Sequence, residues 1–202
     1  SSMSPNGERV VFNARGEIFS VPTKNGITRN LSNTSGSHER NATWSPDGKN
    51  IAYISDTNGE FEIYIISQEG SKKPIQLTKN ADTYKYHLKW SPDSKKILWS
   101  DRKLRLKYVD IESKKVSQID KIGTGEIFSF NWSPDSKWIS YSHNTENQFS
   151  IVYLYSLEQK IKYPVTDMWY SSYSPVFSPD GKYLYFISQR DFNPIYSQTE
   201  WN

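Results

Sequence analysis

The residue types that most often ligate metals or carry protons are sparse in this chain. Its 202 residues include three histidines and no cysteine. The histidines, His38, His87 and His143, fall in different parts of the sequence and in no metal-binding spacing such as His-x-x-x-His or His-Glu-x-x-His. Without cysteine there is neither a disulfide nor a thiolate metal site. We therefore predict no metal and no cofactor, and expect each histidine at an edge or in a channel.

Serine and aspartate are plentiful, but their arrangement does not predict catalysis. A catalytic triad needs a nucleophile, a base and an orienting group that converge, and the chain has no Gly-x-Ser-x-Gly elbow. Aspartates recur in a Ser-Pro-Asp motif but are far apart in sequence, at Asp47, Asp93, Asp135 and Asp180. Gly-Thr-Gly-Glu at 123–126 precedes no helical pattern, so it is no phosphate cradle. We predict that this chain alone is not an enzyme.

The same Ser-Pro-Asp motif marks an internal repeat. Its prolines, with a related Ser-Pro-Asn at the start, are Pro5, Pro46, Pro92, Pro134 and Pro179. The intervals are 41, 46, 42 and 45 residues. A four-stranded propeller blade repeats every ~40–45 residues, and some helical repeats share this period.

The residues around the motif favour strands. Counted from each motif serine, the sixth residue is aliphatic and the eighth aromatic, as in Ile51 with Tyr53 or Ile97 with Trp99. This alternation is typical of a strand with one buried face. Proline and aspartate suit the centre of a tight turn and glycine its left-handed last position, so the motif predicts a hairpin connection. Ser94 and Ser136 replace that glycine, and we expect modest strain there.

Each unit continues with two further strand-like segments, so the chain predicts an all-β fold, a β-propeller of four-stranded antiparallel blades. We expect one propeller segment over 1–202, with a partial blade at 1–36, whole blades at 37–80, 81–121 and 122–167, and a partial blade at 168–202. No stretch of ~18 apolar residues is present, so we expect no membrane insertion.

The incomplete end units allow two arrangements. Propellers close with about four to eight blades, so five units would form a small ring. The alternative, which we favour, is an arc of a larger propeller with exposed blade flanks. The net charge of +3 comes from scattered residues with no basic stripe, so we expect no nucleic-acid partner.

A propeller offers its central channel as a binding surface, and the residues just before each motif lead into it. Five positions before the motif serine are Arg40, Tyr86, Phe128 and Tyr173, and His87 lies four positions before. These five are our candidate substrate-channel residues. Arg40 and His87 are favoured because a charged or titratable side chain needs water or a partner. Packing between blades is the alternative role for each of them.

Longer segments resemble a known family. The sequences RGEIFSVP (15–22), ERNATWSPDGKNIAYISDTNGEFEIYI (39–65), FNWSPDSKWISYS (130–142) and SPVFSPDGKYLYFISQRDFNP (174–194) resemble the PD40-type propeller of tricorn protease and its bacterial homologues. The resemblance covers essentially the whole chain. The Ser-Pro-Asp-Gly repeat itself is shared with TolB-like and prolyl-oligopeptidase propellers, whereas the first and last of these segments are more specific.

The resemblance implies a large serine peptidase, in which propellers precede a PDZ-like module and a catalytic domain. Such propellers guide or gate unfolded peptides, so the expected partners are unfolded polypeptide and the remaining domains of the parent peptidase. No segment here matches the catalytic residues of the family or its basic pair that anchors carboxylates. The alternative is a TolB-like module that binds proteins in the cell envelope. Localisation stays open, with the periplasm slightly favoured over the cytoplasm.

Exposed blade edges at both ends predict self-association, because unpaired strand edges pair with other chains. We expect dimers or larger species in light scattering at high protein concentration. A monomer at every concentration would contradict this expectation.

Overall fold

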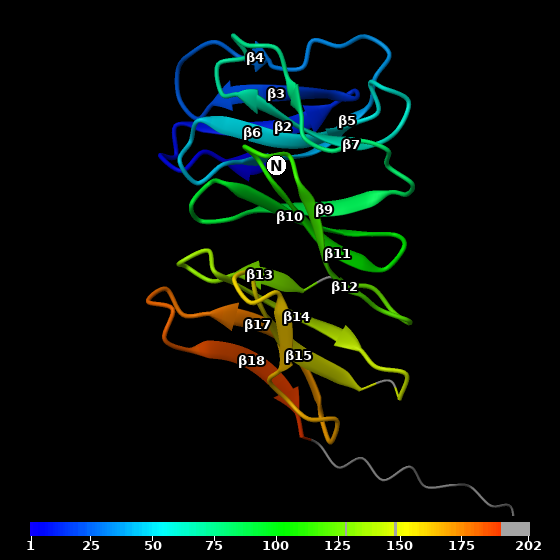
Figure 1. Cartoon of the computed structure of the whole chain (residues 1–202). Helices are drawn as coiled ribbons and strands as arrows, with labels where there is room; N and C mark the ends of the chain where they lie inside the picture. The colour runs from blue at the N-terminus through cyan, green and yellow to red at the C-terminus, as the bar shows by residue number, and fades with distance from the viewer. Residues whose placement is uncertain (128, 148, 191–202) are drawn as a thin grey trace, which may run out of the picture.

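The computed structural model of the chain describes residues 1–127, 129–147 and 149–190, and all of the regular elements in these ranges are β-strands. They form five antiparallel sheets, four with four strands and one with two. The sheets follow one another in chain order, so the first lies at one end of the molecule and β17–β18 at the other (Figure 1). No helix in these ranges is long and apolar enough to cross a membrane.

The strands are short and joined in sequence order within each sheet. The first sheet contains β1 (Ser2–Met3), β2 (Arg9–Ala14), β3 (Glu17–Pro22) and β4 (Arg29–Asn30). The second contains β5 (Glu39–Trp44), β6 (Asn50–Ser55), β7 (Glu62–Ser67) and β8 (Ile75–Gln76). The third contains β9 (Lys85–Trp90), β10 (Lys96–Asp101), β11 (Arg105–Asp110) and β12 (Val116–Lys121). The fourth contains β13 (Phe130–Trp132), β14 (Trp138–Asn144), β15 (Ser150–Ser156) and β16 (Ile161–Pro164), and the fifth β17 (Ser171–Phe177) and β18 (Leu184–Gln189).

This architecture confirms the predicted all-β propeller of four-stranded blades. The first sheet has only two residues in β1, and the last has two strands, as expected for incomplete end units. Among the described residues no strand of the first sheet pairs with the last sheet, so the sheets form an open arc. The small closed ring is not formed.

The first strand of each sheet lies on the inner edge of the arc. β1 contacts β5, β5 contacts β9, and β13 contacts β17, so the first strands of successive sheets approach one another. Because the strands alternate in direction, the Ser-Pro-Asp turns all lie at one end of the sheets, which we call the turn face. The connections between second and third strands, and those between sheets, lie at the opposite end, which we call the loop face.

Apolar side chains fill the space between sheets. Ile51, Ile97 and Ile139, at the sixth motif position, are fully buried, and the aromatic residues at the eighth position in the same three sheets, such as Trp99, are buried as well. The tryptophans before the motif serines also join neighbouring sheets. Trp90 Nε1 donates to the Thr43 carbonyl oxygen at 3.2 Å, and Trp132 Nε1 donates to that of Lys89 at 3.1 Å. These bonds fix the first strands of the third and fourth sheets against the one before.

Each Ser-Pro-Asp turn is held by the same small network. In the second sheet, Ser45 Oγ donates to Asp47 Oδ1 at 2.6 Å and accepts from the Asn50 N–H at 3.0 Å. Asp47 Oδ1 also accepts from the Lys49 N–H at 3.0 Å. The Gly48 N–H closes the turn on the Ser45 carbonyl oxygen at 2.9 Å. Equivalent bonds occur in the other four turns, with Asn6 in the place of aspartate in the first.

Hydrogen bonds to the carboxylate favour its charged form. The Ser133 hydroxyl and the Lys137 N–H accordingly lower the pKa of Asp135. Because the pKa is lower in the folded state, this contribution to stability is present at neutral pH. It is lost as the pH falls from the unfolded-state value of about 4 through the folded-state pKa.

The two serines that replace glycine each form a hydrogen bond that the sequence did not predict. Ser94 and Ser136 adopt the left-handed conformation, with φ of 59° and 60°. Ser94 Oγ accepts from the Asp47 N–H at 3.0 Å, and Ser136 Oγ accepts from the Asp93 N–H at 3.1 Å. Each serine therefore connects its own turn to the turn of the preceding sheet. The expected strain is offset by a hydrogen bond between sheets.

This arrangement predicts that two substitutions of Ser94 differ in the free energy of unfolding. Ser94→Ala keeps the positive φ and removes the acceptor of the Asp47 N–H, so it should lower the free energy of unfolding by about 0.5–1.5 kcal/mol. Ser94→Gly also removes the acceptor but relieves about 1–2 kcal/mol of backbone strain, so it should be the more stable variant. Urea unfolding measures both. An alanine variant as stable as the native chain would contradict the role of the hydroxyl.

Candidate functional site

Four aromatic side chains form a row on the loop face, beside the inner edge of the second and third sheets. His38 precedes β5, Phe61 precedes β7, Tyr84 precedes β9, and Tyr86 lies within β9. Successive ring centroids are 6.4, 5.8 and 5.4 Å apart, from His38 to Tyr86. Tyr84 is 41% exposed. We call these four residues the aromatic rim.

Arg40 holds the centre of the aromatic rim together. Its guanidinium carbon lies 4.2 Å from the centroid of the Phe61 ring and 3.4 Å from that of Tyr84, within the range of cation–π attraction. The side chain is 8% exposed, and its three nitrogens have no hydrogen-bond partner among the described residues. Burial lowers the pKa of Arg40 to about 10, an effect that Asp56 opposes, so the group stays charged at neutral pH. Arg40 thus positions two rings from adjacent sheets.

Tyr86 extends the aromatic rim toward the fourth sheet. Its hydroxyl donates to Glu126 Oε1 at 3.1 Å, and Glu126 is an exposed residue of the connection between β12 and β13. Burial and the nearby carboxylate raise the pKa of Tyr86. Asn41 Nδ2 reaches the Tyr86 carbonyl oxygen at 3.4 Å from the irregular part of β5, where Asn41 has a φ of 56°. Side chains of the second sheet, the third sheet and the β12–β13 connection therefore meet along this edge.

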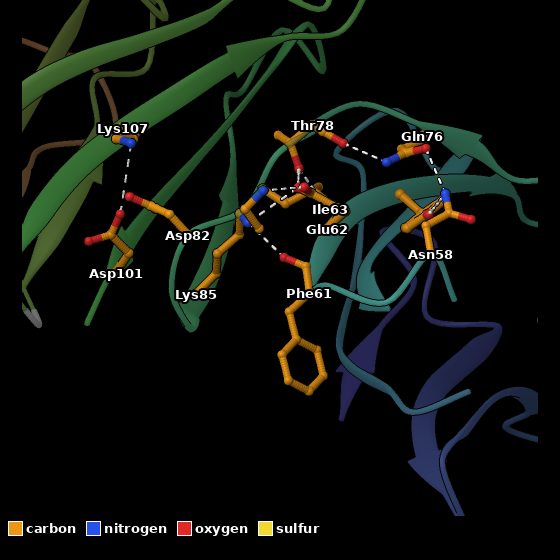
Figure 2. A network of polar contacts seen from close by, with 12 residues as sticks. Asn58, Phe61, Glu62, Ile63, Gln76, Thr78, Asp82, Lys85, Asp101 and Lys107 are labelled. Carbon is orange, nitrogen blue, oxygen red and sulfur yellow. Dashed lines mark hydrogen bonds and ion pairs between the residues drawn. The ribbon is translucent and has the colours of Figure 1, made fainter. Parts of the chain in front are cut away.

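A buried ion pair joins the second and third sheets beside the aromatic rim (Figure 2). Lys85 Nζ lies 3.3 Å from Glu62 Oε2 and donates to the Phe61 carbonyl oxygen at 2.6 Å. Glu62 also accepts from Thr78 Oγ1 at 2.5 Å and from the Ala81 N–H at 2.6 Å. Burial lowers the pKa of Lys85, and Glu62 opposes this effect. Since Glu62 follows Phe61 and Lys85 lies between Tyr84 and Tyr86, the ion pair fixes the backbone that carries these rings.

The side chains of this site offer ring faces and a carboxylate as possible contacts for a ligand. Aromatic faces attract apolar and cationic side chains, and the exposed Glu126 carboxylate adds an acceptor for peptide N–H groups or cations. Within the described ranges no three histidine, aspartate or glutamate residues form a group that could hold a metal ion. The hydroxyl of Tyr86 and the carboxylate of Glu126 hydrogen-bond to each other.

The structure brings together two of the predicted channel residues. Arg40 and Tyr86 both contact Tyr84, whereas His87 is exposed on β9 and has no place in the ring row. Tyr173 lies on β17 of the last sheet and is 37% exposed, away from the aromatic rim. Phe128 lies outside the described residues.

Several members of the site did not emerge from the sequence. Phe61 and Tyr84 were missed because they lie outside the motif. Both directly precede a strand, and this position is the one feature of the sequence that could have indicated them. Glu62 and Lys85 are 23 residues apart, and nothing in their local sequence indicates that they pair.

Comparison with known proteins places the chain among peptidase propellers. The family model described as the tricorn protease second beta propeller domain matches residues 1–202. A tricorn protease homolog of Saccharolobus solfataricus is 30% identical over 98% of this chain, which spans 18% of that relative. Tricorn protease homolog 1 of Streptomyces coelicolor is 26% identical over 91% of this chain and 18% of its own length. The chain thus corresponds to about a fifth of these relatives.

Solved structures agree on the fold. The crystal structure of the tricorn protease superimposes with a TM-score of 0.82 at 19% identity, covering 100% of this chain and 20% of that protein. TolB from Acinetobacter baumannii superimposes with a TM-score of 0.60 at 22% identity, covering 83% of this chain and 43% of TolB. At these identities the two likenesses show the architecture alone.

The buried ion pair predicts that loss of Lys85 lowers the free energy of unfolding much more than loss of a lysine in an exposed ion pair. Lys85→Met leaves the Glu62 carboxylate buried without its cation, which should lower the free energy of unfolding by about 3–5 kcal/mol. Lys103→Met removes a lysine that pairs with the half-exposed Asp82 at 2.8 Å, and should change it by less than about 1 kcal/mol. Urea unfolding of both variants makes the comparison. Equal losses in the two would contradict the structural role of the buried pair.

Proposed function

Because the chain belongs to the family of the tricorn protease second β-propeller domain, we propose that it is a non-catalytic part of a tricorn-like serine peptidase. In this proposal it binds unfolded peptides and guides or gates their passage to a catalytic domain outside this chain. The observation that carries the proposal is the aromatic rim, where rings from two sheets and the Glu126 carboxylate form one binding edge.

The aromatic rim suits peptides that lack folded structure. Such peptides expose apolar side chains and unpaired backbone groups, and ring faces bind many different side chains with little dependence on sequence. Tyr84 is half exposed, and its ring is already held in place by Arg40. A preordered ring loses little conformational freedom on binding, so even a modest contact contributes to affinity. Weak, unselective binding is what a passage for substrates requires.

The predicted channel residues take distinct parts in this proposal. Tyr86 contacts peptide directly, and His87, exposed on the same strand, extends that contact. Arg40 acts by positioning Phe61 and Tyr84. Tyr173, on the first strand of the last sheet, forms a separate contact further along the arc.

A TolB-like role in binding a folded partner remains the alternative. The likeness to TolB is below 25% identity and concerns the fold, and no feature of the described residues favours that role over peptide binding. The two differ in what they bind, so a binding experiment separates them.

Fluorescence anisotropy with a labelled, permanently unfolded peptide tests the proposal on the 202-residue chain. We expect weak, saturable binding, and Tyr84→Ala should weaken it about two- to tenfold, because an aromatic contact contributes about 0.5–1.5 kcal/mol. Tyr86→Ala provides a second variant. Tyr183→Ala removes an exposed tyrosine of the last sheet, outside the aromatic rim, and should leave the affinity unchanged.

Two outcomes would overturn the proposal. One is the absence of binding by the native chain, or equal binding by the Tyr84, Tyr86 and Tyr183 variants. The other concerns catalysis: the peptide should stay intact in these incubations, and hydrolysis that a serine-reactive inhibitor abolishes would show that the chain is itself an enzyme.

A further inference from the structure

A small cavity lies between the second and third sheets, next to the Glu62–Lys85 ion pair. Its volume is about 110 Å³, which is enough for a few water molecules or one small ion. Three carboxylate residues line it, Glu62, Asp82 and Asp101. Four cationic residues also line it, Lys79, Lys85, Arg105 and Lys107. The lining therefore has a net positive charge.

The carboxylates of the cavity already accept hydrogen bonds from neighbouring groups. Asp101 accepts from the backbone N–H groups of Lys103 and Arg105 at 3.0 and 3.2 Å, and from Arg105 Nε at 2.7 Å. Asp82 accepts from Arg105 at 2.5 and 3.0 Å and from Lys103 at 2.8 Å. Glu62 accepts three hydrogen bonds, as described above. A cation in the cavity would find few oxygens that are not already engaged.

One buried donor in the lining is without an acceptor. Trp99 is 2% exposed, and its Nε1–H, like that of Trp44, has no hydrogen-bond partner among the described residues. A buried donor that lacks an acceptor is costly and uncommon in folded proteins. Trp99 differs from Trp44 in that it lines this cavity, where an acceptor could be held.

Lys107 provides a second, partly exposed donor. Its ammonium makes no hydrogen bond within the described part of the chain, and its ion pair with Asp101 Oδ2 is long, at 3.9 Å (Figure 2). Burial and the neighbouring Arg105 lower the pKa of Lys107, although Asp101 opposes this. A negative charge in the cavity would favour the charged form of this lysine. Trp99 and Lys107 can thus both donate to an acceptor in the cavity, and Lys107 is a cation.

We propose that this cavity is a binding site for a small monovalent anion, chloride or a single carboxylate group, held by the Trp99 Nε1–H and the Lys107 ammonium. The anion would neutralise the excess positive charge and bridge β10 and β11 of the third sheet. The site is independent of the aromatic rim and of the proposed peptide binding, since different residues form it.

Chloride-35 NMR tests the proposal on the 202-residue chain. Chloride that exchanges with a protein site gives a broadened signal, so we expect broadening that rises with protein concentration, that falls as added chloride saturates the site, and that acetate reduces. Lys107→Met should remove at least about half of it, with Lys107→Gln as a second variant. The matched control is Lys72→Met, which removes an exposed lysine that does not line the cavity and should keep the broadening.

A pair of small peptides identifies the source of the carboxylate. If triglycine with a free carboxylate displaces chloride as well as acetate does, and triglycine amide does not, the site accepts the carboxylate of a chain end. If only acetate displaces chloride, it accepts free ions. Either result supports the proposal. An absence of broadening in the native chain, or equal broadening in the folded Lys107 and Lys72 variants, would overturn it, and water would then occupy the cavity.

Discussion

One small hydrogen-bonded turn determines how this molecule is built. A serine hydroxyl donates to the aspartate two residues later and accepts from the backbone N–H five residues later, so the turn between the first two strands of each sheet has a fixed shape. Because the turn is fixed, the aliphatic and aromatic residues that follow it in the second, third and fourth sheets are buried between sheets, whereas Phe186 of the last sheet is exposed. The ring before it is fixed too, and Trp90 and Trp132 use their indole N–H groups to hold the preceding strand. The fixed turn therefore positions the residues that pack one sheet against the next.

The regularity of the turn face leaves the loop face free to differ from one sheet to the next. The aromatic rim, the Glu62–Lys85 pair and the small cavity all lie where the connections vary in length and composition. They occur at the junction of the second and third sheets, where Arg40 also lies between two rings. A repeated scaffold with varied loops is a common way to build a binding surface, since the scaffold supplies the rigidity that loops lack.

The sequence predicted what depends on local pattern and missed what depends on distant partners. The repeat interval and the alternation around the motif were sufficient for the fold, and serine in the place of glycine indicated strain. The acceptor role of Ser94 toward Asp47 could not be predicted, because it joins residues 47 positions apart. For the same reason the burial of Arg40 between Phe61 and Tyr84 was not predicted. Side-chain direction in an inner strand is set by the neighbouring sheet.

Amide hydrogen exchange measured by NMR tests most directly whether turn-to-turn bonding joins the sheets. Asp47, Asp93 and Asp135 occupy the same position in nearly identical turns, but only the first two donate to a serine of the following sheet, and Gly181 offers Asp135 no hydroxyl. We predict slow exchange of the Asp47 and Asp93 amides and fast exchange of the Asp135 amide. Equally fast exchange at all three positions would contradict the account.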